Sequence, residues 1–181
     1  MYYYLKTILK KEETLIVFQG NTDRLFDYFV RDAIDGKFLN YVGLKGIAQE
    51  GMKEEDLEKC DFLSGIVGIP IFSERFVEKS SSLLNQECMF YPIEIKCKNK
   101  VKTFYLTKIN CYQGWIDYDN SGFRTLVDGS KMLDKPIVTK VLDNEFYLTR
   151  DTITKSRWAA SEKLKKFVEE HKLNVEFEIV R

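Results

Sequence analysis

The strongest constraint on the fold is an alternation of apolar and charged residues between Ile93 and Leu106. On its first arm the odd positions are largely apolar and the even positions are charged, and Lys98-Asn99-Lys100 suits a tight turn. Successive side chains of a strand point to opposite faces, so this pattern predicts an antiparallel hairpin with one buried face.

Other stretches rich in β-branched and aromatic residues predict further extended segments. Their expected ranges are 2–6, 13–18, 66–72, 136–142, 145–149 and 175–179. The pair 136–142 and 145–149 is expected to join at Asp143-Asn144, a dipeptide that tolerates positive φ. The last strand alternates apolar residues with glutamates, which predicts an acidic outer face.

Helical spacing of apolar residues appears in three places. The first helix is expected to start at Asn21 or Thr22, to carry an i,i+4 pair of Asp27 and Arg31, and to end near Gly36. The second is expected from Ser73 to about Leu84. A third should follow Ser161, because both serines precede a glutamate and can cap the first turn. Residues 54–58 suit a short exposed helix or a loop.

The composition fits one folding unit over residues 1–181. Hydrophobic residues make up 44% of the 181 residues and aromatic residues 14%, which is sufficient for a substantial core. Because no Ser/Gly linker or low-complexity segment divides the chain, we expect a single α+β domain. Its sheet should be mixed or mainly antiparallel, with the helices chiefly on one side.

Charge, apolar runs and cysteine content limit the classes of partner, location and cofactor that we expect. The 28 basic and 28 acidic residues cancel, so the chain as a whole has no field that attracts nucleic acid or an anionic membrane. The start of the chain has no signal-peptide pattern and no run is apolar enough for a membrane helix, so we expect a cytoplasmic location. Four cysteines without a CxxC pair, beside one histidine, predict reduced thiols, no metal and no cofactor.

The order of several short segments resembles a known family. These segments are an apolar run leading into a Ser-Glu helix, then FYLTKIN, WIDYDNS, EFYL, SEKLKKFVEE and VEFEIV. Residues 60–181 are similar in this order to the immunity proteins of bacterial polymorphic-toxin systems, types eleven and forty-three, the first long known as a domain of unknown function. The resemblance implies a cytoplasmic α+β protein that binds and neutralises a cognate toxin and is not an enzyme. Residues 1–60 have no counterpart in it.

A cluster of aromatic and acidic residues is the first candidate for partner binding. It comprises Tyr112, Trp115, Asp117, Tyr118 and Asp119. Large rings bury much area at small entropic cost, which is typical of interface hot spots. The alternative is that Trp115 anchors the core and the aspartates form a solvated turn.

Two charged segments give further candidates. The second choice for partner binding is the acidic run Glu54, Glu55, Asp56 and Glu58, which either faces a basic toxin or is a plain solvated surface. Alternating lysines from Lys96 to Lys102, with Phe104 and Tyr105 beyond them, suit an RNA-binding strand. Lysines also protect exposed sheet edges from pairing, and with zero net charge we do not expect nucleic acid. The sequence leaves homo-oligomerisation open.

An enzyme is the alternative from another class. Asp117 and Asp119, two residues apart, suit the acid and base of a small hydrolase or transferase. The single histidine, His171, lies in the last turn of the third expected helix, where a cation suits the helix dipole. Since the chain carries none of the common catalytic motifs, we expect binding rather than catalysis.

Overall fold

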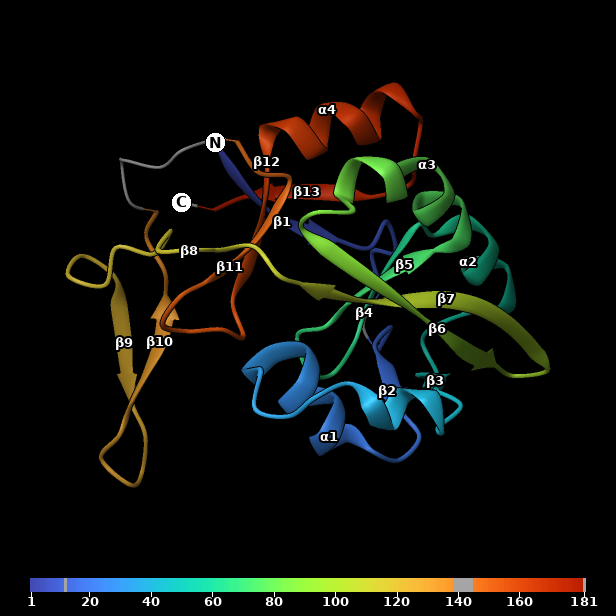
Figure 1. Cartoon of the computed structure of the whole chain (residues 1–181), viewed down its shortest axis with the longest axis horizontal. Coiled ribbons are helices and arrows are strands. Elements are labelled where there is room, and N and C mark those ends of the chain that lie inside the picture. The colour runs from blue at the N-terminus through green and yellow to red at the C-terminus, as the bar shows by residue number, and fades with distance from the viewer. Residues whose placement is uncertain (12, 139–144, 181) are drawn as a thin grey trace.

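A computed structural model describes residues 1–11, 13–138 and 145–180 of the chain. They form a single-domain α+β fold with mixed sheets, which confirms the predicted fold class (Figure 1). The helical elements are α1 (Thr22–Phe26), the π-helical turn η1 (Asp27–Arg31), the 3-10 turn η2 (Lys37–Asn40), α2 (Glu54–Lys59), α3 (Glu74–Leu84) and α4 (Glu162–Glu170).

The larger sheet contains six strands within the described residues. These are β2 (Ile16–Phe18), β3 (Lys45–Ala48), β4 (Phe62–Ser64), β5 (Pro70–Ser73), β6 (Cys88–Cys97) and β7 (Lys100–Ile109). Their order is β2-β3-β6-β7-β5-β4, with β3 and β6 parallel and the other neighbours antiparallel. The predicted hairpin is confirmed as β6 and β7, although its turn has two residues, Lys98 and Asn99, and pairs Cys97 with Lys100.

The smaller sheet contains five strands in the part of the chain that the structure describes. These are β1 (Tyr2–Lys6), β8 (Tyr112–Gln113), β11 (Leu148–Asp151), β12 (Trp158–Ser161) and β13 (Glu176–Ile179), in the order β13-β1-β12-β11-β8. β11, which overlaps the expected strand 145–149, pairs with β12 and β8. The expected pairing of β11 with residues 136–142 is therefore wrong for the residues that the structure describes. Residues 139–144, which include the expected Asp143-Asn144 turn, lie outside the described residues.

Two further strands form a separate hairpin, β9 (Gly122–Thr125) and β10 (Lys131–Lys135). This hairpin projects away from the two larger sheets (Figure 1). The sequence analysis did not predict it, because its strands are short and their alternation of apolar and polar residues is incomplete.

Both long helices start where their serines predict. The hydroxyl of Ser73 accepts a hydrogen bond of 3.1 Å from the backbone N–H of Phe76, and that of Ser161 accepts one of 3.5 Å from Leu164. Each serine is the last residue of a strand, so the hydroxyl satisfies a helix N–H directly at the strand end. Strand and helix are thereby joined without a loop.

The first helix is shorter than predicted. Asn21 has φ 55°, and its side chain makes no capping bond, because a capping residue needs extended backbone. The expected pair of Arg31 and Asp27 forms at 3.1 Å, but η1 ends at Arg31. Asp32 follows with φ 55°, a left-handed conformation that stops the helix four residues before Gly36.

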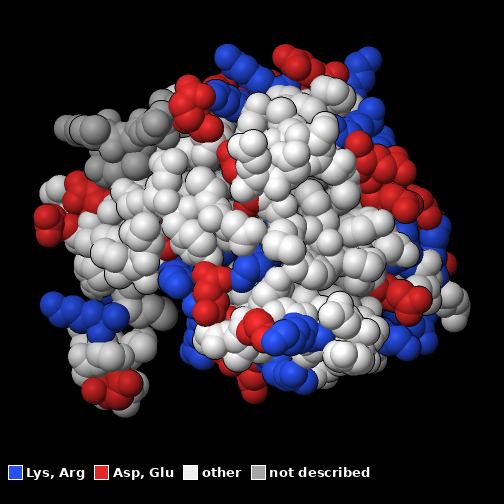
Figure 2. Space-filling model, in the orientation of Figure 1, with Lys and Arg blue, Asp and Glu red and all other residues white. Residues whose placement is uncertain are grey.

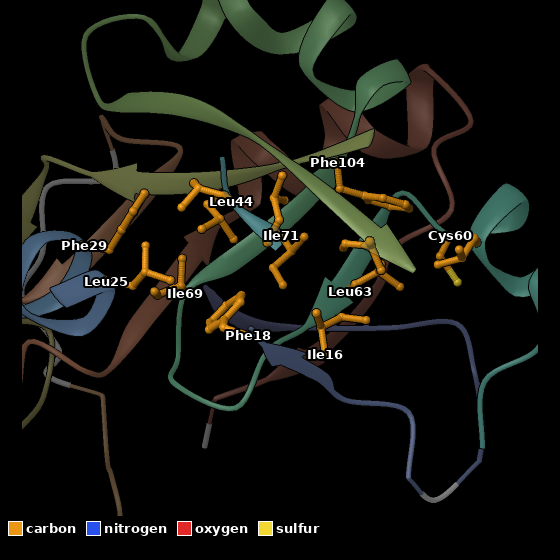
Figure 3. Packing of buried hydrophobic residues seen from close by; sticks show 14 of the residues in the cluster. Ile16, Phe18, Leu25, Phe29, Leu44, Cys60, Leu63, Ile69, Ile71 and Phe104 are labelled. Carbon is orange, nitrogen blue, oxygen red and sulfur yellow. The ribbon is translucent and has the colours of Figure 1, made fainter. Parts of the chain in front are cut away.

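Neighbouring residues of β5 point into different parts of the core. Ile71 packs with Ile16, Leu25 and Phe104, so residues from the first 60 belong to the same cluster as the central strands (Figure 3). Phe72 belongs to a second cluster on the other face, which receives the helices α3 and α4. The two longest helices therefore share one side, while α1 packs on the opposite one.

A third cluster lies where the smaller sheet meets the base of the β9–β10 hairpin. Trp115 stacks on Tyr2 with ring centroids 6.4 Å apart, and Tyr2 stacks on Phe146 at 5.5 Å. Leu133 of β10 is buried in the same cluster. The hairpin is thus anchored to the sheet through one apolar residue of its second strand.

Candidate functional site

Trp115, the aromatic centre of the first predicted site, is fully buried. Its ring packs between Tyr2 and the edge of Tyr4. A side chain without solvent exposure cannot meet a partner in this structure, so Trp115 does not belong to a contact surface. The alternative in which it anchors the core describes it correctly.

Asp117 and Asp119 lie in the turn that leads into the hairpin. The carboxylate of Asp117 accepts hydrogen bonds from the backbone N–H of Asn120 at 3.2 Å and from its amide nitrogen at 2.8 Å. Asp119 is exposed in the same turn. Asp117 thus has the turn-forming role of the alternative reading, and the hydrolase or transferase reading keeps only Asp119 as an exposed carboxylate.

Tyr118 uses its hydroxyl inside the protein. It donates to the buried carboxylate of Asp151, lies 2.8 Å from the hydroxyl of Thr154, and accepts a 3.0 Å bond from the Thr154 N–H. Burial and the bond to Asp151 raise the pKa of Tyr118. The ring therefore fastens the loop between β11 and β12 and is only partly available to a partner.

Tyr112 ends at a charged cluster built around Asp32. The carboxylate of Asp32 accepts hydrogen bonds from the Tyr112 hydroxyl and the Lys108 ammonium, and Lys155 lies 3.6 Å away. Partial burial alone raises the pKa of Asp32, but the bonds from Lys108 and Tyr112 outweigh it and hold this pKa below its usual range. The cluster joins η1 to β7, β8 and the loop after β11.

Arg150 is the least expected member of this region, because it is fully buried in β11. Its Nη1 donates to the carbonyl of Lys155 at 2.8 Å, whereas Nε and Nη2 have no hydrogen-bond partner within the described residues. Burial lowers the pKa of Arg150. Lys108 and Lys155 contact the carboxylate of Asp32, and the charge of Asp32 also favours the charged form of Arg150. Ile153, on the loop between β11 and β12, is 73% exposed.

The acidic run forms α2, and most of its carboxylates already have partners. Glu58 pairs with Lys100 at 2.6 Å and Lys102 at 2.9 Å, and these bonds lower the pKa of Glu58 to about 2. Asp56 is buried and accepts from Lys11 and from the backbone of Lys53, both at 2.8 Å. Asp56 is therefore a structural carboxylate, and the second predicted site does not present it to a partner.

The other two acidic residues of that site differ in availability. Glu54 accepts a 2.8 Å bond from the backbone N–H of Asn99, while Glu55 is exposed. The run and the lysines of the β6–β7 hairpin thus neutralise one another. This leaves Glu55 as the clearest exposed charge of the second predicted site.

The lysines of the hairpin do not form one stripe. Lys96 pairs with Val101, whereas Lys102 pairs with Ile95, and paired residues share a face. The two-residue turn therefore sends Lys96 and Lys102 to opposite faces of the sheet. Phe104 is fully buried and cannot stack on a base. This geometry contradicts the single nucleic-acid-binding face that the alternation predicts.

The segment that contains the first predicted site, from Trp115 to Ser121, instead provides the base of the β9–β10 hairpin. The N–H of Asp117 donates to the carbonyl of Ile137 at 2.8 Å, and the hydroxyl of Ser121 accepts from the N–H of Ile137 at 2.9 Å. Arg157 adds a 3.3 Å bond to the carbonyl of Leu133. These bonds, together with the buried ring of Trp115 below, fix how the hairpin leaves the sheet.

The hairpin carries an exposed apolar surface that sequence reasoning missed. We call its residues Phe123, Leu126, Val127 and Met132 the hairpin surface; the register pairs Phe123 with Leu133 and Met132 with Arg124, so Phe123 and Met132 lie on opposite faces, while Leu126 and Val127 lie together at the tip. Val127 at the tip has a relative exposure of 111%, the value of a side chain with no covering neighbour. The available signal is five large apolar residues, Leu133 included, within a segment 122–135 otherwise made of glycine, serine, threonine and charged residues.

Hydrogen bonds close the tip that presents Val127. The N–H of Leu126 donates to the carbonyl of Ser130 at 2.8 Å, and Asp128 accepts from the N–H of Ser130 at 2.9 Å. Gly129 has φ +81°, which closes the turn at low steric cost. A preformed tip loses little entropy when it binds.

The hairpin carries charged side chains as well as its exposed apolar ones. Figure 2 shows the hairpin at the lower left of the view, with both basic and acidic side chains on it, whereas the least charged part of the visible face lies over other elements.

Comparisons with known proteins add no assignment: neither a family model nor a curated protein matches the chain. The described residues contain no helix that is long and apolar enough to cross a membrane. In the same residues, no three His, Cys, Asp or Glu side chains gather as a metal site.

Proposed function

We propose that this chain is a cytoplasmic immunity protein that binds a cognate bacterial toxin in a stoichiometric complex and neutralises it. The observation that carries the proposal is the projecting hairpin, whose hydrogen-bonded tip exposes Leu126 and Val127. A chain gains nothing in stability from holding Val127 and Leu126 away from its own core, so burial of these side chains against a partner is the stabilising outcome. The resemblance of residues 60–181 supplies the class of partner.

The contact surface in this proposal differs from the one that the sequence favours. Val127 and its neighbours supply the apolar centre, and the partly buried ring of Tyr118, whose centroid lies 6.5 Å from that of Phe123, forms a polar rim together with the exposed Asp119. Apolar centres surrounded by polar rims are the usual anatomy of such contacts. Neutralisation follows when the bound hairpin covers or locks the active region of the toxin.

The test takes the toxin domain that the proposal requires in a neighbouring reading frame and produces it together with this chain; absence of such a frame would count against the proposal. Wild-type chain should restore growth of cells that make the toxin, and calorimetry should give a one-to-one complex. Val127→Asp should weaken binding by about tenfold or more, because the charge must lose its water at the centre of the contact.

Val101→Asp is the matched control. Val101 is also an exposed valine next to a hairpin turn, but it lies in β7 rather than in the projecting hairpin. It should leave binding and growth unchanged. If the wild-type chain gives no protection, or if both variants bind as tightly as wild type, the proposal is wrong.

A further inference from the structure

An open groove lies beside the base of the hairpin. It has a volume of about 790 Å³ and is formed by the end of β10, the strands β1 and β13, and residues 156–158 of the loop into β12. Lys135, Pro136 and Ile137 form its hairpin side. Lys135 is the last residue of β10, so the groove and the hairpin adjoin at this residue.

The groove has an excess of positive charge. Its lining contains the cations Lys6, Lys135 and Arg157, against the single carboxylate of Glu178. Glu178 pairs with Lys6 at 3.0 Å in an exposed ion pair. Neither Lys135 nor Arg157 has a carboxylate within 4.0 Å among the described residues. An anionic group is the complementary ligand for these two cations.

The remaining lining is largely apolar. Tyr4 contributes part of its side chain, whereas its hydroxyl is shielded from solvent and makes no hydrogen bond within the described residues. Trp158, Ile137 and Ile179 add apolar surface around it.

We propose that this groove binds an extended acidic segment of the partner protein, in which an Asp or Glu side chain lies next to a large apolar one. The carboxylate lies between Lys135 and Arg157, and the apolar side chain packs against Ile137 and Trp158. This inference rests on the proposed function, because it takes the partner to be a protein already docked on the adjoining hairpin. It deepens that function by assigning the chemistry of a second contact.

The experiment uses the full chain, labelled with ¹⁵N and ¹³C, and the probe peptide acetyl-Ala-Glu-Leu-Asp-Ala-amide. The control probe replaces Glu with Gln and Asp with Asn, which keeps the shape and removes the charge. The acidic peptide should shift the NMR signals of Lys135, the Arg157 side chain and the Tyr4 ring, and the amide peptide should not.

Charge reversal at the groove should remove the response. Lys135→Glu should weaken the acidic peptide by about fivefold or more, since it replaces an attractive contact by a repulsive one. Lys131→Glu changes the same charge on the same exposed strand but outside the groove, and should have no effect. Lys135→Gln removes the charge without reversing it. It provides the same test if the reversed charge of Lys135→Glu disturbs the hairpin, and it should also weaken binding of the acidic peptide.

Several results would overturn the inference. The first is that the amide peptide shifts the NMR signals as much as the acidic peptide does. The second is that Lys131→Glu weakens peptide binding as much as Lys135→Glu does. The third is that acetate alone gives the same shifts, which would mean that the groove is only a small-anion site. Failure here is separable from failure of the proposed function. If Val127→Asp still abolishes protection while the peptide does not bind, only the groove inference falls.

Discussion

The buried carboxylate of Asp61 should be the most costly polar group to remove. Its side chain is 3% exposed and accepts bonds from the Ser73 hydroxyl at 2.5 Å, from the backbone N–H of Asn174 at 2.7 Å and from Arg75 Nε at 3.1 Å. One group thus joins the loop before β13 to the start of α3. Asp61→Ala leaves all these donors without their acceptor.

The magnitude follows from the exposure of each donor. Arg75 is about half exposed, so its ion pair contributes at most about 1 kcal/mol. The bonds from Ser73 and Asn174 are shielded and go to a charged acceptor, so each contributes about 1.5–3 kcal/mol. Because the donors act as one network, their contributions do not simply add. We expect Asp61→Ala to lower the free energy of unfolding by about 3–5 kcal/mol.

The effect should depend on pH in a definite direction. Burial alone raises the pKa of Asp61, but the bonds from Arg75, Ser73 and Asn174 outweigh it and hold this pKa below its usual value. A depressed native pKa means that the carboxylate stabilises the fold above its unfolded pKa of about 3.9 and loses this effect as pH falls through the native pKa. The difference between wild type and Asp61→Ala should therefore shrink in acid.

Urea unfolding at pH 7 and at pH 3 measures both quantities. Arg75→Ala is the graded comparison, because it leaves the carboxylate its bonds from Ser73 and Asn174 and should therefore cost less than Asp61→Ala. A loss below about 1 kcal/mol for Asp61→Ala, or an equal loss at both pH values, would refute the reasoning.

Three further predictions concern the candidate site. Asp32→Asn should lower the free energy of unfolding by about 1–3 kcal/mol and speed amide exchange in residues 152–157, because the cations of its cluster lose their counterion; unchanged exchange would show that the cluster does not hold the loop. Tyr118→Phe should cost about 1–2 kcal/mol in thermal unfolding, since its buried acceptor loses the hydroxyl; no change would mean that water replaces it. Trp115→Ala should cost about 3–5 kcal/mol in urea unfolding through the cavity it leaves, whereas Val127→Ala should change stability by less than about 0.5 kcal/mol; equal costs would contradict their assigned burial.

Local chemistry in the sequence predicted the regular elements well. The serines at 73 and 161 identify helix starts because the capping bond depends only on residues three apart. The alternation along 93–106 identifies the hairpin because the face on which a strand residue lies also depends only on its near neighbours in the sequence. The first helix was overextended because the apolar spacing continues to Ala33, while the left-handed backbone at Asp32 stops it, and apolar periodicity carries no information on that conformation.

The candidate site was harder to predict because it depends on contacts between distant segments. Trp115 has the composition of a hot spot, and only the packing of Tyr2 and Leu133 around it shows that it is core. Asp56 similarly belongs to an acidic run, and only Lys11, 45 positions earlier, shows why it is buried. Residue type predicts what a side chain can do, whereas burial decides whether a partner meets it.

The base of the hairpin and its contact surface have different requirements, and this affects how mutants must be interpreted. Trp115 and Asp117 fix the direction in which the hairpin leaves the sheet, so under the proposed function their variants should reduce toxin protection without contacting the toxin. Val127 does not help to fix this direction, so substitutions of Val127 should reduce protection without changing the free energy of unfolding. Only loss of binding that is unaccompanied by a fall in the unfolding free energy therefore identifies a contact residue.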